Sequence, residues 1–200
     1  MNDTQKDLVP RNFSERRQHY IEHFTFPYTP SWIKEYPLIS AVFNLLRHSR
    51  LSTVAELGCN DGGLAVKCLR DNSYPLKWIG YDFLKQHIER SHWHPSYKPV
   101  LMDKYLWEMS EVQPFDIFVA SHVMEHLYPE EIQQLAVWLA PRAKHLIMVA
   151  PLGHFETAEH AARSGHILTK GSSWISDVLQ NVGFVPVWET GRWFGWFQKK

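Results

Sequence analysis

One stretch, Ser52–Gly63 (STVAELGCNDGG), constrains the fold of this chain more than any other. It opens with strand-forming and apolar residues, is interrupted by Glu56, and then passes through Gly58, Asn60 and Gly62 into a helical pattern. A strand, a tight loop and a helix N-terminus in this order form the entrance to a nucleotide site in a doubly wound α/β sheet. Glycine lets the backbone turn sharply and approach a ligand, and asparagine tolerates left-handed backbone angles.

Glu56 distinguishes between the ligands that such a loop accepts. A carboxylate at the end of the strand repels the pyrophosphate of a dinucleotide, but it suits a ligand that presents an ammonium group. The stretch resembles the first motif of the class I S-adenosylmethionine-dependent methyltransferases, an acid followed by G-x-G-x-G, and the matching residues are Glu56, Gly58, Asn60 and Gly62. An NAD-linked oxidoreductase remains an alternative, because Gly58, Asn60 and Gly63 fit the dinucleotide spacing loosely.

A second acid follows at the expected distance. The apolar run Leu76–Tyr81 predicts the next strand and ends at Asp82, and 82 − 62 gives 20 residues after Gly62. An acid at this place can accept hydrogen bonds from both hydroxyls of a ribose. We therefore assign Asp82, with its neighbour Phe83, to the cofactor site.

A third acid follows the next apolar run, Val100–Met102. The connection before that run is His92–Pro99, and the acid after it is Asp103. The resemblance places such a residue near the adenine amino group, although an aspartate before a helix is also a common N-cap.

A fourth segment matches the same family. The run Pro114–Ala120 predicts a buried strand, and it leads into Val123–His126 (VMEH), with Ser121 and His122 at the mouth. In the family that the chain resembles, a similar phrase follows the fourth strand. Ligands lie beyond the carboxyl ends of parallel strands, so we expect this loop, including Ser121 and His122, to face the sulfonium and its methyl group.

Histidine is the natural base for a hydroxyl or amine nucleophile, because its pKa is near ~6.5. Methyl transfer is an in-line displacement in which the protein supplies alignment and sometimes that base. We assign His126 and His166 as the catalytic candidates. The alternative is that the histidine of this phrase only packs or forms structural hydrogen bonds, as it often does in the resembled family.

A metal site is a further alternative. His122, Glu125 and His126 have i, i+3, i+4 spacing, which places three ligands on one face of a helical turn, and His166 is available as a fourth. The arrangement resembles that of small-RNA terminal methyltransferases. With His122 in place of an acid, a softer ion than Mg²⁺ is favoured. We assign no metal ligand and leave this question open.

The rest of the chain fits one domain, residues 1–200. Residues 1–50 predict two helices, Phe13–Phe24 and Trp32–Arg50. In the family that the chain resembles, helices before the first strand often cover the active site, so the resemblance makes Tyr20, Phe26, Tyr28 and Trp32 candidates for a lid; the alternative is that these aromatic residues only pack the helices onto the sheet. Residues 51–200 predict the cofactor-binding core. Its last two runs, Phe184–Glu189 and Arg192–Gln198, flank a hairpin signal. The expected fold is α/β, a doubly wound, mostly parallel seven-stranded sheet that ends in an antiparallel hairpin, the Rossmann-like methyltransferase fold.

Composition excludes several classes of partner. Lys+Arg and Asp+Glu are 21 each, so no overall field draws the chain to nucleic acid, and no apolar run approaches the ~20 residues of a membrane span. The polar N-terminus lacks the apolar core of a signal peptide, so we expect a cytoplasmic protein.

The sequence thus predicts a transferase that moves a methyl group from S-adenosylmethionine to an oxygen or nitrogen of a small-molecule acceptor. A catalytically silent S-adenosylmethionine-binding or partner-binding protein is the main alternative. The sequence does not indicate the acceptor or the oligomeric state.

Overall fold

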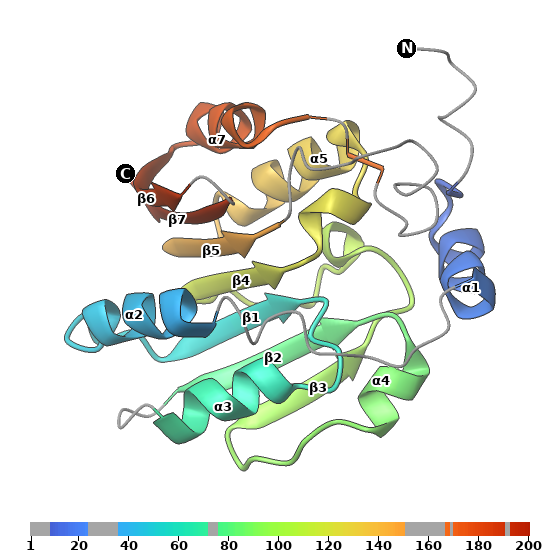
Figure 1. Ribbon diagram of the computed structural model, residues 1–200, viewed down its shortest axis with the longest axis horizontal. Helices are drawn as coiled ribbons and strands as arrows, with labels where there is room; N and C mark the ends of the chain where they lie inside the picture. Colours follow the sequence, from blue (N-terminus) through green and yellow to red (C-terminus); the bar gives the residue numbers. More distant parts are fainter. Residues whose placement is uncertain (1–8, 24–35, 72–75, 151–166, 169, 191–192) are drawn as a thin grey trace.

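Seven strands form one sheet in the order β3-β2-β1-β4-β5-β7-β6 (Figure 1). The computed structural model describes residues 9–23, 36–71, 76–150, 167–168, 170–190 and 193–200. From β3 to β5 in this order, each strand is parallel to its neighbours, whereas β7 is antiparallel to both β5 and β6. The strands are β1 (Thr53–Leu57), β2 (Lys77–Asp82), β3 (Tyr97–Leu101), β4 (Ile117–Ser121), β5 (His145–Val149), β6 (Phe184–Thr190) and β7 (Phe194–Lys199). The expected doubly wound sheet with its antiparallel C-terminal pair is confirmed.

Two helical layers cover the sheet, because its central strands alternate apolar residues toward both faces. In β4, Ile117 and Val119 pack into the core beneath α2 (Tyr36–Leu46) and α3 (Gly63–Asp71). Phe118 and Ala120 pack on the opposite face, where the core includes residues of α5 (Pro129–Leu139) and α7 (Ser172–Asn181). The remaining helices in the described residues are α1 (Phe13–His23), α4 (Lys85–Glu89) and the single 3₁₀ turns η3 (Leu106–Glu108) and η4 (Met124–His126).

The strand order reverses between β1 and β4, because the chain fills the sheet outward from β1 to β3 and then returns to the other side of β1. Such a switch point leaves a crevice beyond the carboxyl ends of the two central strands. The glycine loop follows β1, and the phrase Val123–His126 follows β4. The topology therefore brings both predicted motifs to one edge of the sheet.

Three predicted boundaries were wrong. The strand predicted at Pro114–Ala120 spans Ile117–Ser121 as β4. We expected the third strand at Val100–Met102 after a connection that includes Pro99, but β3 spans Tyr97–Leu101. β3 is an edge strand, where proline is tolerated because its missing N–H removes no ladder hydrogen bond. We also expected a helix to Arg50, but α2 ends at Leu46, and Arg50 adopts a φ of 53° in the turn before β1.

The helix α1 lies across the carboxyl edge of the sheet (Figure 1, right). A buried ion pair anchors it, because Arg16 Nη1 lies 2.8 Å from Glu131 Oε2 and both residues are only 5–6% exposed. The Tyr128 hydroxyl, just before α5, donates to the carbonyl of Val9 at 2.5 Å. The predicted lid segment therefore begins at the edge that carries the motifs. Phe26, Tyr28 and Trp32 lie outside the described residues.

Within the described part of the chain, none of the helices is both long and apolar enough to span a membrane.

We expect Arg16→Ala to loosen α1. Removing one partner of a buried ion pair leaves the other charge buried and costs ~3–5 kcal/mol. Hydrogen exchange of the backbone amides in Phe13–His23 should become faster than in the wild type. Glu15→Ala is the matched control, because Glu15 is an exposed residue on the same helix. Equal exchange in the two variants would show that the ion pair does not hold α1 in place.

Candidate active site

The glycine loop and the end of β2 form one hydrogen-bonded unit. The amides of Gly58 and Cys59 both donate to the carbonyl of Tyr81, at 2.8 and 3.2 Å. Asn60 adopts a φ of 50°, the left-handed conformation anticipated for it, and its amide donates to Asp82 Oδ2 at 2.9 Å. The loop after β1 is thus held by hydrogen bonds to the neighbouring strand.

Two glycines of the loop are required by close neighbours. Gly58 and Gly62 have φ values of 71° and 72°, which residues other than glycine rarely adopt. A Cβ on Gly58 would lie 2.5 Å from Val123 Cγ2, beyond β4, and one on Gly62 would overlap the ring of Tyr97. Gly58 therefore lets the loops after β1 and β4 touch. No sequence pattern indicated that Tyr97 lies against Gly62.

Asp82 lies at the end of β2, as predicted, and organises its surroundings. Its Oδ1 accepts from the amide of Leu84 at 2.8 Å, and its Oδ2 accepts from Asn60 and lies 3.2 Å from His87 Nδ1. A carboxylate has about four lone-pair positions. Three are engaged, which leaves capacity for a ligand hydroxyl. The contact between Asp82 and His87 was not predicted. The only sequence feature that could have indicated it is that His87 follows Asp82 by five residues, where the chain passes from a strand into a helix.

Glu56 is buried at 2% exposure, and its Oε2 accepts a 2.8 Å hydrogen bond from Trp78 Nε1. Burial raises the pKa of the Glu56 carboxyl to about 8, with smaller contributions from the charges of Asp82 and Asp61, and the hydrogen bond from Trp78 opposes the rise. A cationic group placed beside Glu56 would lower this pKa and favour the charged carboxylate.

The segment after β4 forms a second polar cluster. His122 has a φ of 57°, and its Nδ1 lies 3.4 Å from Glu125 Oε1. Glu125 is fully buried. Burial alone would raise the pKa of this carboxyl, but the hydrogen bond from His122 and the charges of His126 and His122 hold it below its usual value. Ser121, at the end of β4, has a hydroxyl oxygen that is buried.

His126 faces the N-terminal helix. Its Nδ1 lies 3.0 Å from the hydroxyl of Tyr20, and the two rings meet edge to face with centroids 5.8 Å apart. Phe83, at the end of β2, also contacts Tyr20, with ring centroids 5.4 Å apart. Sequence analysis had named Tyr20 only as part of a lid. The structure connects it to the predicted base and to a predicted cofactor residue.

The structure does not bring every predicted residue into this cluster. Asp103 is exposed and lies two residues beyond β3. His166 lies outside the described residues. Among the residues that are described, no three or more histidine, cysteine, aspartate or glutamate side chains are placed to hold a metal ion.

Comparison with solved structures identifies the fold. The chain superposes on magnesium protoporphyrin IX methyltransferase (ChlM) from Synechocystis, determined with bound SAH, with a TM-score of 0.66 and 14% identity over 100% of this chain and 96% of that one. A TehB-like SAM-dependent methyltransferase from Corynebacterium glutamicum gives a TM-score of 0.60 with 16% identity over 94% of this chain and 96% of that one.

A third similar structure is the N-methyltransferase NodS from Bradyrhizobium japonicum, with a TM-score of 0.61 and 15% identity over 85% of this chain and 97% of that one. No protein-family model and no curated protein matches the sequence. At these identities the likeness concerns the fold.

We expect Gly62→Ala to destabilise the protein by ~2–4 kcal/mol, because it combines a left-handed backbone with overlap against Tyr97. Chemical denaturation measures the change. Gly171→Ala is the control, because nothing lies within 4 Å of a Cβ there, and it should change stability by less than ~1 kcal/mol. Similar losses in both variants would contradict the packing described for Gly62.

We expect Glu56→Gln to alter the pH dependence of stability. When a carboxyl has a higher pKa in the folded than in the unfolded state, the native protein binds more protons than the unfolded protein at pH values between the two pKa values. The free energy of unfolding then falls as pH rises from about 4.5 to about 8 and levels off above this range. Glutamine keeps an acceptor for Trp78 and does not titrate. The variant should therefore gain stability relative to the wild type, by on the order of a few kcal/mol, between pH 5 and 8.

The control is Asp177→Asn, since Asp177 is exposed on α7. Its stability should follow the wild type at every pH. If the free energy of unfolding of Glu56→Gln also changed with pH in the same way as that of the wild type, the shifted pKa of Glu56 would be refuted.

Proposed function

We propose that this chain, which has the fold of the class I S-adenosylmethionine-dependent methyltransferases, transfers a methyl group from S-adenosylmethionine to an oxygen or nitrogen of a small-molecule acceptor. One observation carries the proposal. At the switch point of the sheet, a left-handed glycine loop is hydrogen-bonded to the acid that ends the next strand, and a buried glutamate lies in β1 just before the loop.

The residues at this edge fit the cofactor. Asp82 has unused acceptor capacity for a ribose hydroxyl, and Glu56 is a buried carboxyl with a pKa of about 8 that a ligand ammonium would bring into its charged form. When bound, the cofactor supplies a methyl group on a sulfonium. The neighbour from Synechocystis was determined with bound SAH, the product of such a cofactor, and this supports the proposal.

Glu56 also counts against the dinucleotide alternative. A pyrophosphate beside the loop would be near Asp61 and Asp82, whose charges already help to raise the pKa of Glu56. Adding a phosphate charge there increases the repulsion. An ammonium reduces it, which favours the methyltransferase over an NAD-linked oxidoreductase.

His126 is the proposed base. In the tautomer whose Nδ1 carries the proton and donates to the Tyr20 hydroxyl oxygen, Nε2 holds the lone pair that accepts a proton from the acceptor. The buried Glu125 carboxylate, whose pKa is lowered in part by the charge of His126, stabilises the imidazolium that results. Removing this proton frees a lone pair on the acceptor oxygen or nitrogen for in-line attack on the methyl group, whose bonding electron pair would remain on the sulfur. His166 is retained as a second candidate base from the sequence.

Isothermal titration calorimetry tests the proposed cofactor. We expect S-adenosylmethionine and S-adenosylhomocysteine to bind the wild type and NAD not to bind. Glu56→Gln should weaken S-adenosylhomocysteine binding by ~1.5–3 kcal/mol, the worth of a hydrogen bond to a charged group. Asp177→Asn, which removes one negative charge from an exposed position of α7, should bind as the wild type does.

Binding of NAD without binding of S-adenosylhomocysteine would overturn the proposal. Tight binding of S-adenosylmethionine without methyl transfer to any of a panel of hydroxyl and amine acceptors would instead favour the catalytically silent alternative.

A further inference from the structure

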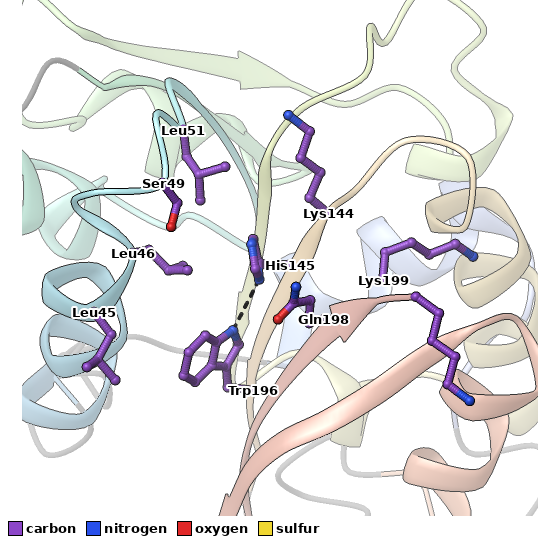
Figure 2. Close-up of a pocket in the computed structure, with 10 residues that line it drawn as sticks. Leu45, Leu46, Ser49, Leu51, Lys144, His145, Trp196, Gln198 and Lys199 are labelled. Carbon is purple, nitrogen blue, oxygen red and sulfur yellow. Dashed lines mark hydrogen bonds between the residues drawn. The ribbon is translucent and has the colours of Figure 1, made fainter.

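A cavity of about 650 Å³ opens at the amino edge of the sheet, opposite the candidate active site. It lies where α2 ends, β5 begins and β7 ends (Figure 2). Cavities that bind small molecules commonly have ~300–1,000 Å³. The lining residues are Leu45, Leu46, Ser49, Leu51, Lys144, His145, Trp196, Gln198, Lys199 and Lys200.

One side of this amino-edge cavity is apolar. Leu45, Leu46 and Leu51 come from the end of α2 and the turn that follows it, and Figure 2 shows them across from His145 and Trp196. Leu45 is 62% exposed, although it is a large aliphatic side chain. The indole of Trp196 and the imidazole of His145 lie with ring centroids 6.2 Å apart. Leucines facing two adjacent rings favour a flat apolar ligand.

The His145 imidazole presents a proton donor. Trp196 Nε1, which can only donate, makes a 3.4 Å hydrogen bond to His145 Nδ1, so Nδ1 acts as the acceptor. Burial lowers the pKa of His145, and the charge of Lys144 lowers it further while that of Asp116 opposes this. The ring is therefore neutral at pH 7, and its proton is on Nε2. A ligand that accepts a hydrogen bond suits this nitrogen.

The charge of the lining is positive. Lys144 and Lys200 contribute ammonium groups, and none of the lining side chains is acidic. The Lys199 ammonium is engaged elsewhere, because it donates to the Val182 carbonyl and lies over the Phe184 ring, and neither residue lines the cavity. Arg47 and Arg50 lie in the same turn as Ser49 and add to the positive charge at this edge. The whole chain has a formal net charge of +0, so this excess is local.

The Asp116 carboxylate, which pairs with Lys144, does not cancel this positive charge, because other hydrogen-bond donors also engage it. Asp116 Oδ2 accepts from the amides of Ser52 and Thr53 and from the Thr53 hydroxyl, and Oδ1 accepts from Lys144 Nζ at 2.7 Å. Burial opposes ionisation, but these donors outweigh it and lower the pKa of Asp116 to about 2. The Lys144 side chain is 66% exposed, so it can turn to a ligand while three hydrogen bonds still hold Asp116.

We propose that the amino-edge cavity binds a small aromatic carboxylate, with its ring between the leucines and Trp196 and its carboxylate beside His145 Nε2 and Lys144. This site is separate from the proposed methyl-transfer site, and the proposal does not depend on that function.

The test uses the full chain and a matched pair of probes, 2-naphthoate and the neutral 2-naphthamide, by isothermal titration calorimetry. We expect one molecule of 2-naphthoate to bind, and 2-naphthamide to bind about tenfold more weakly or worse, because the amide lacks the charge. Leu45→Glu should weaken the binding of 2-naphthoate by about tenfold or more, and Leu45→Lys should bind 2-naphthoate at least as tightly as the wild type does.

Val137→Glu is the matched control, because Val137 is 63% exposed on α5 and does not line the cavity. It should leave the affinity unchanged. Equal binding of the two probes would overturn the proposed recognition of the anion. Binding that Leu45→Glu does not weaken would place the probe elsewhere, and absence of saturable 2-naphthoate binding would exclude the site.

Discussion

The hydrogen bond from the Asn60 amide to Asp82 is the contact on which the carboxyl edge of this protein depends. It requires the left-handed backbone of Asn60, and it joins the loop after β1 to the end of β2. Asp82 extends the connection to α4 through the amide of Leu84 and the imidazole of His87. On the other side, the missing side chain of Gly58 makes room for Val123, which follows β4. Three strand ends are thereby fixed relative to one another.

Besides Glu131, which pairs with Arg16, three carboxyl groups are buried at this edge, and each is stabilised differently. Asp82 accepts backbone hydrogen bonds, Glu125 lies beside His122, and Glu56 has only an indole donor and a pKa of about 8. A buried charge is tolerated only when it is paired or hydrogen-bonded, and otherwise the group is neutralised. Glu56 is therefore the least compensated of the three. This makes it the carboxyl group whose charged form a neighbouring cation would stabilise most.

The helix α1 is part of this edge rather than an appendage. Its Arg16 is buried against Glu131 of α5, and its Tyr20 reaches both His126 and Phe83. Ordering a helix over a site costs conformational entropy, which the buried ion pair and the aromatic contacts offset. The opposite edge of the sheet carries a different surface, with leucines, Trp196 and lysines around a cavity. The two edges of one sheet thus differ in their chemistry: the carboxyl edge carries buried carboxyl groups, and the amino edge carries lysines.

The sequence by itself determined the order of the elements and placed Glu56 and Asp82 in the first two strands with the glycine loop between them, because these follow from local periodicity and glycine spacing. The complete doubly wound sheet was expected because these motifs resemble those of a known family. The sequence misplaced β3, since Pro99 indicates a loop unless the strand is known to lie at an edge. Only the tertiary structure decided that Trp78 bonds to Glu56, that Tyr97 closes on Gly62 and that Tyr20 meets His126. Tyr20 and His126 are 106 residues apart, and no local pattern encodes such a contact. Backbone geometry depends on neighbours along the chain, whereas the partners of buried polar groups depend on how distant elements pack.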